Sequence, residues 1–182
     1  MWAFILVDVL CILACAIATV TDLRAYRIPN WLTVSAILAG LAVNPLAQLA
    51  VHGLAGAKAG ALSAAAGCLL MVLVFGLFGA LRFVGMGDVK LMAGVGALIG
   101  WPLAMAALIY VTLAGGVLAL AIAVGRGQLG AVLRNIFRVG RRMVRRGAPD
   151  DVALHRIPYA LAILAGSSWA VATRYCAGLR LM

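Results

Sequence analysis

The sequence predicts an all-α integral membrane protein, a bundle of about six transmembrane helices with an additional cytoplasmic amphipathic helix. Of its 182 residues, 66% are hydrophobic and only 11% are charged, which is too little polar surface for a soluble domain of this length. In addition, five apolar stretches reach or approach the roughly 20 residues that a helix needs to cross a hydrocarbon core of about 30 Å.

These apolar stretches assign nearly the whole chain to a single polytopic membrane domain, residues 1–182. The five long stretches are residues 2–20, 31–51, 59–81, 102–124 and 157–176. A sixth stretch, residues 89–100, is shorter and rich in glycine. It is expected to be a helix as well, because Trp101 and Pro102 then make a tight turn into the next one. The substantial polar segment is a basic loop at about residues 125–156.

The basic residues are distributed unevenly, and this distribution predicts the orientation in the membrane. With the N-terminus outside, the outer segments hold only Lys58, Arg174 and Arg180, and the other twelve of the fifteen Lys and Arg residues are cytoplasmic. This is the positive-inside pattern. Residues 129–146 place apolar side chains at helical spacing between arginines, which predicts an amphipathic helix on the anionic lipids of the cytoplasmic leaflet. The net charge of +10 therefore does not require nucleic acid as a partner.

All five acidic residues are aspartates, and three of them lie in or beside predicted membrane helices. Asp22 directly follows the first predicted helix and Asp88 lies just before the fourth, the glycine-rich one, so two complete crossings return both to the cytoplasmic face. Two neighbouring carboxylates at one depth share a proton near neutral pH, as in aspartic proteases. Asp8 lies on the same helix face as Asp22 but about 21 Å away. We therefore expect Asp8 to make a structural polar contact.

The residues around Asp22 and Asp88 form two motifs. Residues 85–91 read GMGDVKL and contain G-x-G-D, while residues 22–30 read DLRAYRIPN. Together with IPYA at residues 157–160, they resemble the type IV prepilin peptidase family of GxGD aspartyl proteases. The chain is similar to the short, Flp/Tad-type members, because it lacks the cysteine-bearing cytoplasmic insert of larger members. This departure leaves an N-methyltransferase activity without support.

The resemblance implies a membrane-embedded aspartyl endopeptidase that removes the basic leader peptide from prepilin or pseudopilin precursors. The cut would fall at the cytoplasmic face of the bacterial inner membrane. Asp22 and Asp88 would be the catalytic pair, with no metal or other cofactor. Gly85 and Gly87 would let backbone or substrate approach Asp88 closely, and close helix packing is the alternative explanation for both glycines.

Three basic residues complete the candidate site. Lys90 is expected either to hold substrate and tune the charge of the aspartate pair, or to be an ordinary lysine of the inner face. Arg24 and Arg27 are likewise expected either to support the site or to anchor the chain at the cytoplasmic surface. The four cysteines form no CxxC pair and are expected to be free, buried thiols; they are Cys11, Cys15, Cys68 and Cys176.

Two other functions are compatible with these residues. A presenilin-like protease shares the GxGD motif, but the segment that follows Asp22 resembles prepilin peptidases instead. A non-catalytic pilus assembly factor or a small proton or cation transporter would use Asp8, Asp22 and Asp88 as a polar path. The position of cleavage on a model substrate separates the two proteases, and ion flux in liposomes separates an enzyme from a transporter.

Overall fold

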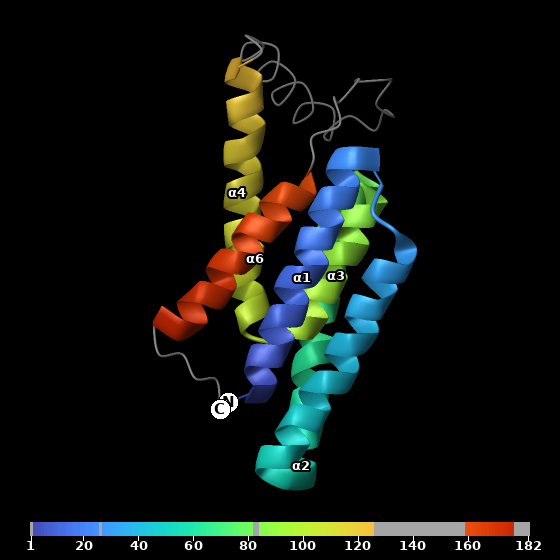
Figure 1. Cartoon of the computed structure of the whole chain (residues 1–182), viewed down its shortest axis with the longest axis vertical. Coiled ribbons are helices and arrows are strands. Elements are labelled where there is room, and N and C mark those ends of the chain that lie inside the picture. The colour runs from blue at the N-terminus through green and yellow to red at the C-terminus, as the bar shows by residue number, and fades with distance from the viewer. Residues whose placement is uncertain (1, 26, 82–83, 126–158, 177–182) are drawn as a thin grey trace, which may run out of the picture.

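A computed structural model describes residues 2–25, 27–81, 84–125 and 159–176, and within them all regular structure is helical (Figure 1). The helices are α1 (Trp2–Ala25), α2 (Asn30–Ala80), α3 (Met86–Ile99), α4 (Leu103–Gly125) and α6 (Tyr159–Cys176). The all-α class predicted from composition is confirmed. The amphipathic helix expected at residues 129–146 lies outside the described residues.

The long helix α2 turns back on itself at Gly53 and so contains both of the helices predicted at residues 31–51 and 59–81. Gly53 has φ 64° and ψ −153°, a backbone conformation that favours glycine. Beyond the break, a Cβ on Gly60 would lie 2.7 Å from the carbonyl oxygen of Asn44. In one continuous helix these two residues would be about 24 Å apart. Residues 30–52 and 54–80 are therefore two antiparallel arms, called here the first and second arms.

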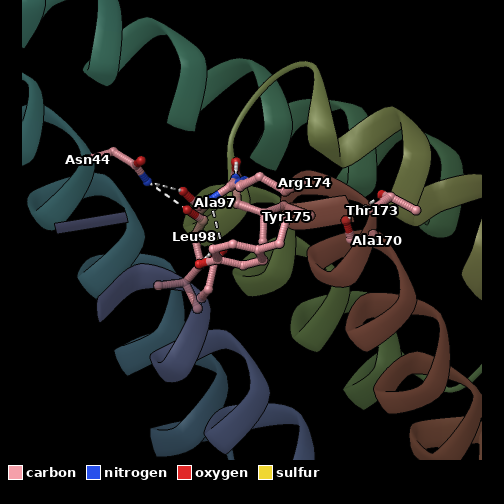
Figure 2. A network of polar contacts seen from close by, with 9 residues as sticks. Asn44, Ala97, Leu98, Ala170, Thr173, Arg174 and Tyr175 are labelled. Atoms are coloured by element: carbon pink, nitrogen blue, oxygen red, sulfur yellow. Dashed lines mark hydrogen bonds and ion pairs between the residues drawn. The ribbon is translucent and has the colours of Figure 1, made fainter. Parts of the chain in front are cut away.

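Helix α3 is packed between the two arms, and ten of its fourteen residues are buried. Gly40 of the first arm meets the backbone of Ala97, and Gly67 of the second arm meets the backbone carbonyl of Gly96. The amide of Asn44 donates to the carbonyl oxygens of Ala97 at 2.9 Å and of Leu98 at 2.8 Å (Figure 2). Small residues that let helix backbones touch are how membrane helices gain packing energy. The arms and α3 thus form the tightest part of the fold.

Helices α4 and α6 form a second packing unit, in which Gly166 of α6 meets the backbone of Val111. Figure 1 shows α6 crossing α4 and α1 obliquely, with its beginning near the end of α1. The predicted tight turn at Trp101 and Pro102 joins α3 to α4. Ser63 of the second arm secures this turn, because it accepts from the Trp101 amide at 3.1 Å and donates to the Trp101 carbonyl at 2.8 Å.

Three of these helices are long and apolar enough to cross a membrane, namely α1, α2 and α4. The described residues therefore support an all-α membrane protein, but not the six spans that were predicted. Helix α3 is too short for a full crossing because its 14 residues extend only about 21 Å. Helix α6 has 18 residues and carries Arg174 in its last turn.

Two further expectations need correction. Asp22 lies inside α1 and does not follow it, since the helix continues to Ala25 beyond the apolar stretch. Hydropathy marks where hydrocarbon ends, whereas the helix continues until its backbone hydrogen bonds stop. The cysteines of the described residues are free, but only Cys11 and Cys15 are buried, while Cys68 is half-buried and Cys176 is exposed. A helix in a membrane presents apolar side chains to lipid as well as to its own core.

The packing of α3 predicts a difference between two glycines. A methyl group on Gly96 overlaps the backbone carbonyl of Gly67, whereas a methyl group on Gly76 meets nothing within 4 Å. We expect Gly96→Ala to cost about 1–3 kcal/mol of unfolding free energy, or more, because neither backbone can move aside. In detergent this lowers the Tm by at least several degrees, at about 2–4 °C per kcal/mol. Gly76→Ala should leave the Tm unchanged or slightly higher, and equal Tm values for both variants would contradict this packing.

Candidate active site

Asp88 lies in the first turn of α3, where the local backbone positions its carboxyl group. Gly85 is the N-cap of the helix, and its backbone N–H donates to the Asp88 side chain. This is the reciprocal half of a capping box, in which the residue three places after the cap binds back to it. Among the described residues the other oxygen, Oδ1, is buried without a hydrogen-bond partner. One oxygen of Asp88 is thus held by its own helix and one is available.

Asp22 lies near the end of α1, and α1 and α3 are in contact, with the end of α1 beside the start of α3 (Figure 1). Burial raises the pKa of Asp88 most, the nearby charge of Asp22 raises it further, and the Gly85 hydrogen bond lowers it, with a result of about 7. Asp88 is outside the three apolar spans. The structure therefore brings the two aspartates together, with Asp88 the member that keeps a proton up to neutral pH.

The two glycines of the motif have different surroundings. A Cβ on Gly85 would lie 3.1 Å from Oδ2 of Asp88, so that a side chain there would press on the carboxyl group itself. A Cβ on Gly87 would lie 3.4 Å from the Cβ of Ile28, in the connection between α1 and α2. Gly85 thus allows close approach to Asp88, whereas a Cβ on Gly87 would make only an ordinary van der Waals contact with the connection.

The three basic candidates lie on the surface of the same end of the bundle. Lys90 is exposed, and its Nζ donates to Oδ1 of Asn30 at 3.0 Å, which links α3 to the start of α2. The sequence did not predict this contact. Arg24 and Arg27 are exposed, the first in the last turn of α1 and the second in the connection that follows. In the part of the chain that is described, no three His, Cys, Asp or Glu side chains gather as metal ligands would.

Sequence reasoning missed one residue that interacts electrostatically with Asp88, namely Tyr159, the first residue of α6. Its ring lies 6.3 Å from the ring of Phe75 in the second arm and covers Gly115 of α4. The charge of Asp88 acts electrostatically on its phenol. The signal available in the sequence was its place in the IPYA motif, directly after the basic loop and so on the same side as both aspartates.

The third membrane aspartate, Asp8, lies at the opposite end of the bundle in a network of its own. Arg174 Nη1 lies 2.8 Å from Oδ1 of Asp8, and the Tyr175 hydroxyl donates to Oδ2 at 2.7 Å. Arg174 also donates to the carbonyl of Ile99, at the end of α3, at 3.1 Å (Figure 2). This is the structural polar contact expected for Asp8. It also explains the position of Arg174, which is paired and largely buried.

Comparison with known proteins identifies a family that the chain matches. A family model described as the type IV leader peptidase family matches residues 9–120. The match includes Asp22, the G-x-G-D motif and Asp88, and it ends before α6. Searches of curated proteins and of solved structures found no match.

The ion pair at the opposite end predicts a stability difference between single and double variants. Arg174→Met leaves Asp8 buried without its cation, which we expect to cost about 3–5 kcal/mol. The double variant Asp8→Leu/Arg174→Met removes both charges and should recover most of that loss. Thermal unfolding in detergent measures both, and a double variant as unstable as the single one would contradict a paired, buried Asp8.

The raised pKa of Asp88 predicts a pH-dependent effect of Asp88→Asn. Since the folded state binds this proton more tightly than the unfolded chain, the associated stability is present below a pH of about 4. It is lost as the pH rises through about 7. Asparagine does not ionise, so the Tm of Asp88→Asn should exceed that of the wild type by more at about pH 8 than at about pH 5.

Asp22→Asn is the matched control for this effect. It removes the charge of Asp22, which raises the pKa of Asp88, and leaves the larger effect of burial in place. Its Tm advantage over the wild type should have the same pH dependence with a smaller amplitude. An advantage of Asp88→Asn that is equal at both pH values would show that Asp88 ionises normally.

Proposed function

The chain belongs to the type IV leader peptidase family, and on this premise we propose that it is a membrane-embedded aspartyl endopeptidase acting through Asp22 and Asp88. Its substrates are pilin precursors of the Flp/Tad type, from which it removes the basic leader. The observation that carries the proposal is a half-buried carboxyl group with a pKa of about 7 beside a second carboxylate. Such a pair supplies an acid and a base at the same pH.

In the proposed mechanism Asp22 is the base and Asp88 is the acid. Asp22 takes a proton from water as the water oxygen bonds to the scissile carbonyl carbon. Asp88 gives its proton to the carbonyl oxygen as the C=O π bond breaks, which yields a tetrahedral diol. When the diol collapses, the C–N bond breaks, the proton on Asp22 passes to the leaving nitrogen, and one hydroxyl proton returns to Asp88.

The proposal places this site at the cytoplasmic edge of the inner membrane, with the N-terminus outside. The crossings are α1, the two arms of α2, α4 and α6. The sixth segment is α3, which is shorter than a full crossing and is enclosed by the two arms. The positive-inside distribution supports this orientation. So does the structure, since Arg174 is neutralised by Asp8 and adds no free charge on the outer side.

The substrate and lipid partners follow from the same orientation. A basic leader that ends at the membrane edge brings its cleavage site to the depth of Asp22 and Asp88. Residues 125–156 would rest on anionic lipids, and neither a cofactor nor nucleic acid is part of the proposal. The short type of the family gives no basis for adding N-methyltransferase activity.

Cleavage of a tagged Flp-type prepilin, co-expressed with this protein, tests the proposal. We expect wild type to shorten the prepilin on a gel, with mass spectrometry placing the cut before the pilin's hydrophobic helix. Asp22→Asn and Asp88→Asn should each reduce cleavage by about 100-fold or more, since each removes one half of the acid–base pair. Asp151→Asn is the matched control and should cleave as wild type does.

Three other outcomes would contradict the proposal in whole or in part. Full cleavage by a well-inserted Asp22→Asn or Asp88→Asn variant removes that residue from the mechanism. A cut within the hydrophobic helix of the substrate indicates presenilin-like cleavage. If wild type leaves several prepilins intact and conducts ions in liposomes, the protein is a transporter that uses the aspartates as a polar path.

A further inference from the structure

The first turn of α6, which begins at Tyr159, is held by contacts with three other helices. Thr19 of α1, three residues before Asp22, donates from Oγ1 to the backbone carbonyl of Ala160 at 3.1 Å, and Thr19 is itself buried. The ring of Phe75 lies 6.3 Å away on the second arm. The first turn of α6 is therefore tied to the same part of α1 that carries Asp22.

The second arm connects Tyr159 to Asp88 as well. Phe75 lies one helical turn from Gly79, and a Cβ on Gly79 would lie 2.9 Å from the side chain of Val89. Val89 is the residue after Asp88, so the ring of Tyr159 is packed within about one turn of the level of Asp88. The electrostatic interaction between Asp88 and the phenol is in agreement with this position.

The position of the hydroxyl group is set by Gly115 of α4. A Cβ on Gly115 would lie 2.7 Å from the phenol oxygen and 2.6 Å from Cε2 of the ring. The absence of a side chain at residue 115 thus leaves the space that the phenol occupies. A phenol that served only to fill space between helices would not need to be a tyrosine, because phenylalanine supplies the same ring.

The proposed hydrolysis would be faster with a second hydrogen-bond donor at the scissile carbonyl oxygen, and a hydroxyl group can be that donor. Oδ1 of Asp88 is buried without a partner among the described residues. When a peptide carbonyl oxygen accepts the proton of Asp88, negative charge develops on that oxygen before the transfer is complete. A second donor aimed at this oxygen stabilises the transition state more than the ground state.

We propose that the Tyr159 hydroxyl is this second donor, and that it binds the scissile carbonyl oxygen together with Asp88. Tyr159 gives a hydrogen bond and keeps its proton throughout, so the acid and base steps remain those of Asp88 and Asp22. This inference rests on the proposed peptidase function and adds a third residue, from α6, to its active site.

Kinetics of purified enzyme on a prepilin peptide test the proposal. Tyr159→Phe keeps the ring that packs on Phe75 and Gly115 and removes only the hydroxyl group. We expect its kcat to fall by at least about 10-fold with little change in KM. The limb of the kcat/KM profile that falls as the pH rises through about 7 should stay in place, because Oδ1 of Asp88 has no partner among the described residues and so loses none.

A second variant moves the hydroxyl group while keeping the tyrosine. Gly115→Ala places a methyl group where the phenol lies, so it should lower kcat in the same way even if Tyr159→Phe does not fold. Gly116→Ala is its matched control, because a methyl group there meets nothing within 4 Å. Tyr110→Phe, which changes a tyrosine that packs on Trp169, is the control for the loss of a phenol.

The outcomes separate this inference from the function on which it rests. If wild type does not cleave prepilins, the peptidase function fails. If wild type cleaves, and Tyr159→Phe and Gly115→Ala have its kcat, then the function stands and the role of Tyr159 is wrong. Loss of activity in Gly116→Ala or Tyr110→Phe to the same extent would also overturn it, because the effect would then be general loosening of α4 and α6.

Discussion

The burial of α3 between the two arms of α2 is the constraint on which the rest of the structure depends. The backbones touch at Gly40 and Ala97 and again at Gly67 and Gly96, which fixes the register of α3 against both arms. The two arms therefore set the position of the first turn of α3, which carries Asp88.

Helix α3 also runs between the two polar ends of the bundle, where the membrane carboxylates have neighbours of opposite charge. At the far end Arg174 neutralises Asp8, and the hydroxyl of Tyr175 donates a hydrogen bond to it. Arg174 also donates to the last carbonyl of α3. This is the arrangement that makes a buried charge tolerable. At the near end Asp88 faces a like charge, Asp22, and has one oxygen without a partner among the described residues. The fold thus pairs one membrane carboxylate with a cation and another with a second carboxylate, and the proposed function assigns the chemistry to the second pair.

Sequence reasoning succeeded where the information is local and failed where it depends on distant packing. Apolar length predicted α1, the two arms, α4 and α6 closely, and the motif residues placed Asp22 and Asp88 on one side. Hydropathy did not show that α1 continues past Asp22. It also did not show that Arg174 pairs with Asp8, since the two residues are 166 positions apart. Tyr159 was missed for the same reason: its neighbours come from α1, the second arm and α4, and its importance appears only when these are assembled.

The position of Asp88 at the start of a helix, and not in its middle, has consequences for the chemistry. The backbone N–H groups of the first turn of α3 have no partners within the helix and carry a partial positive charge. This end of α3 favours negative charge on Asp88 and on an oxygen bound to it, whereas burial and Asp22 oppose that charge. The two effects act in opposite directions, and the pKa that results is near neutral. Burial deep in the bundle would have kept Asp88 permanently protonated, and full exposure would have kept it permanently ionised. In the proposed mechanism, a carboxyl group at the helix start, at the edge of the bundle, gives up its proton to a substrate and recovers it in each turnover.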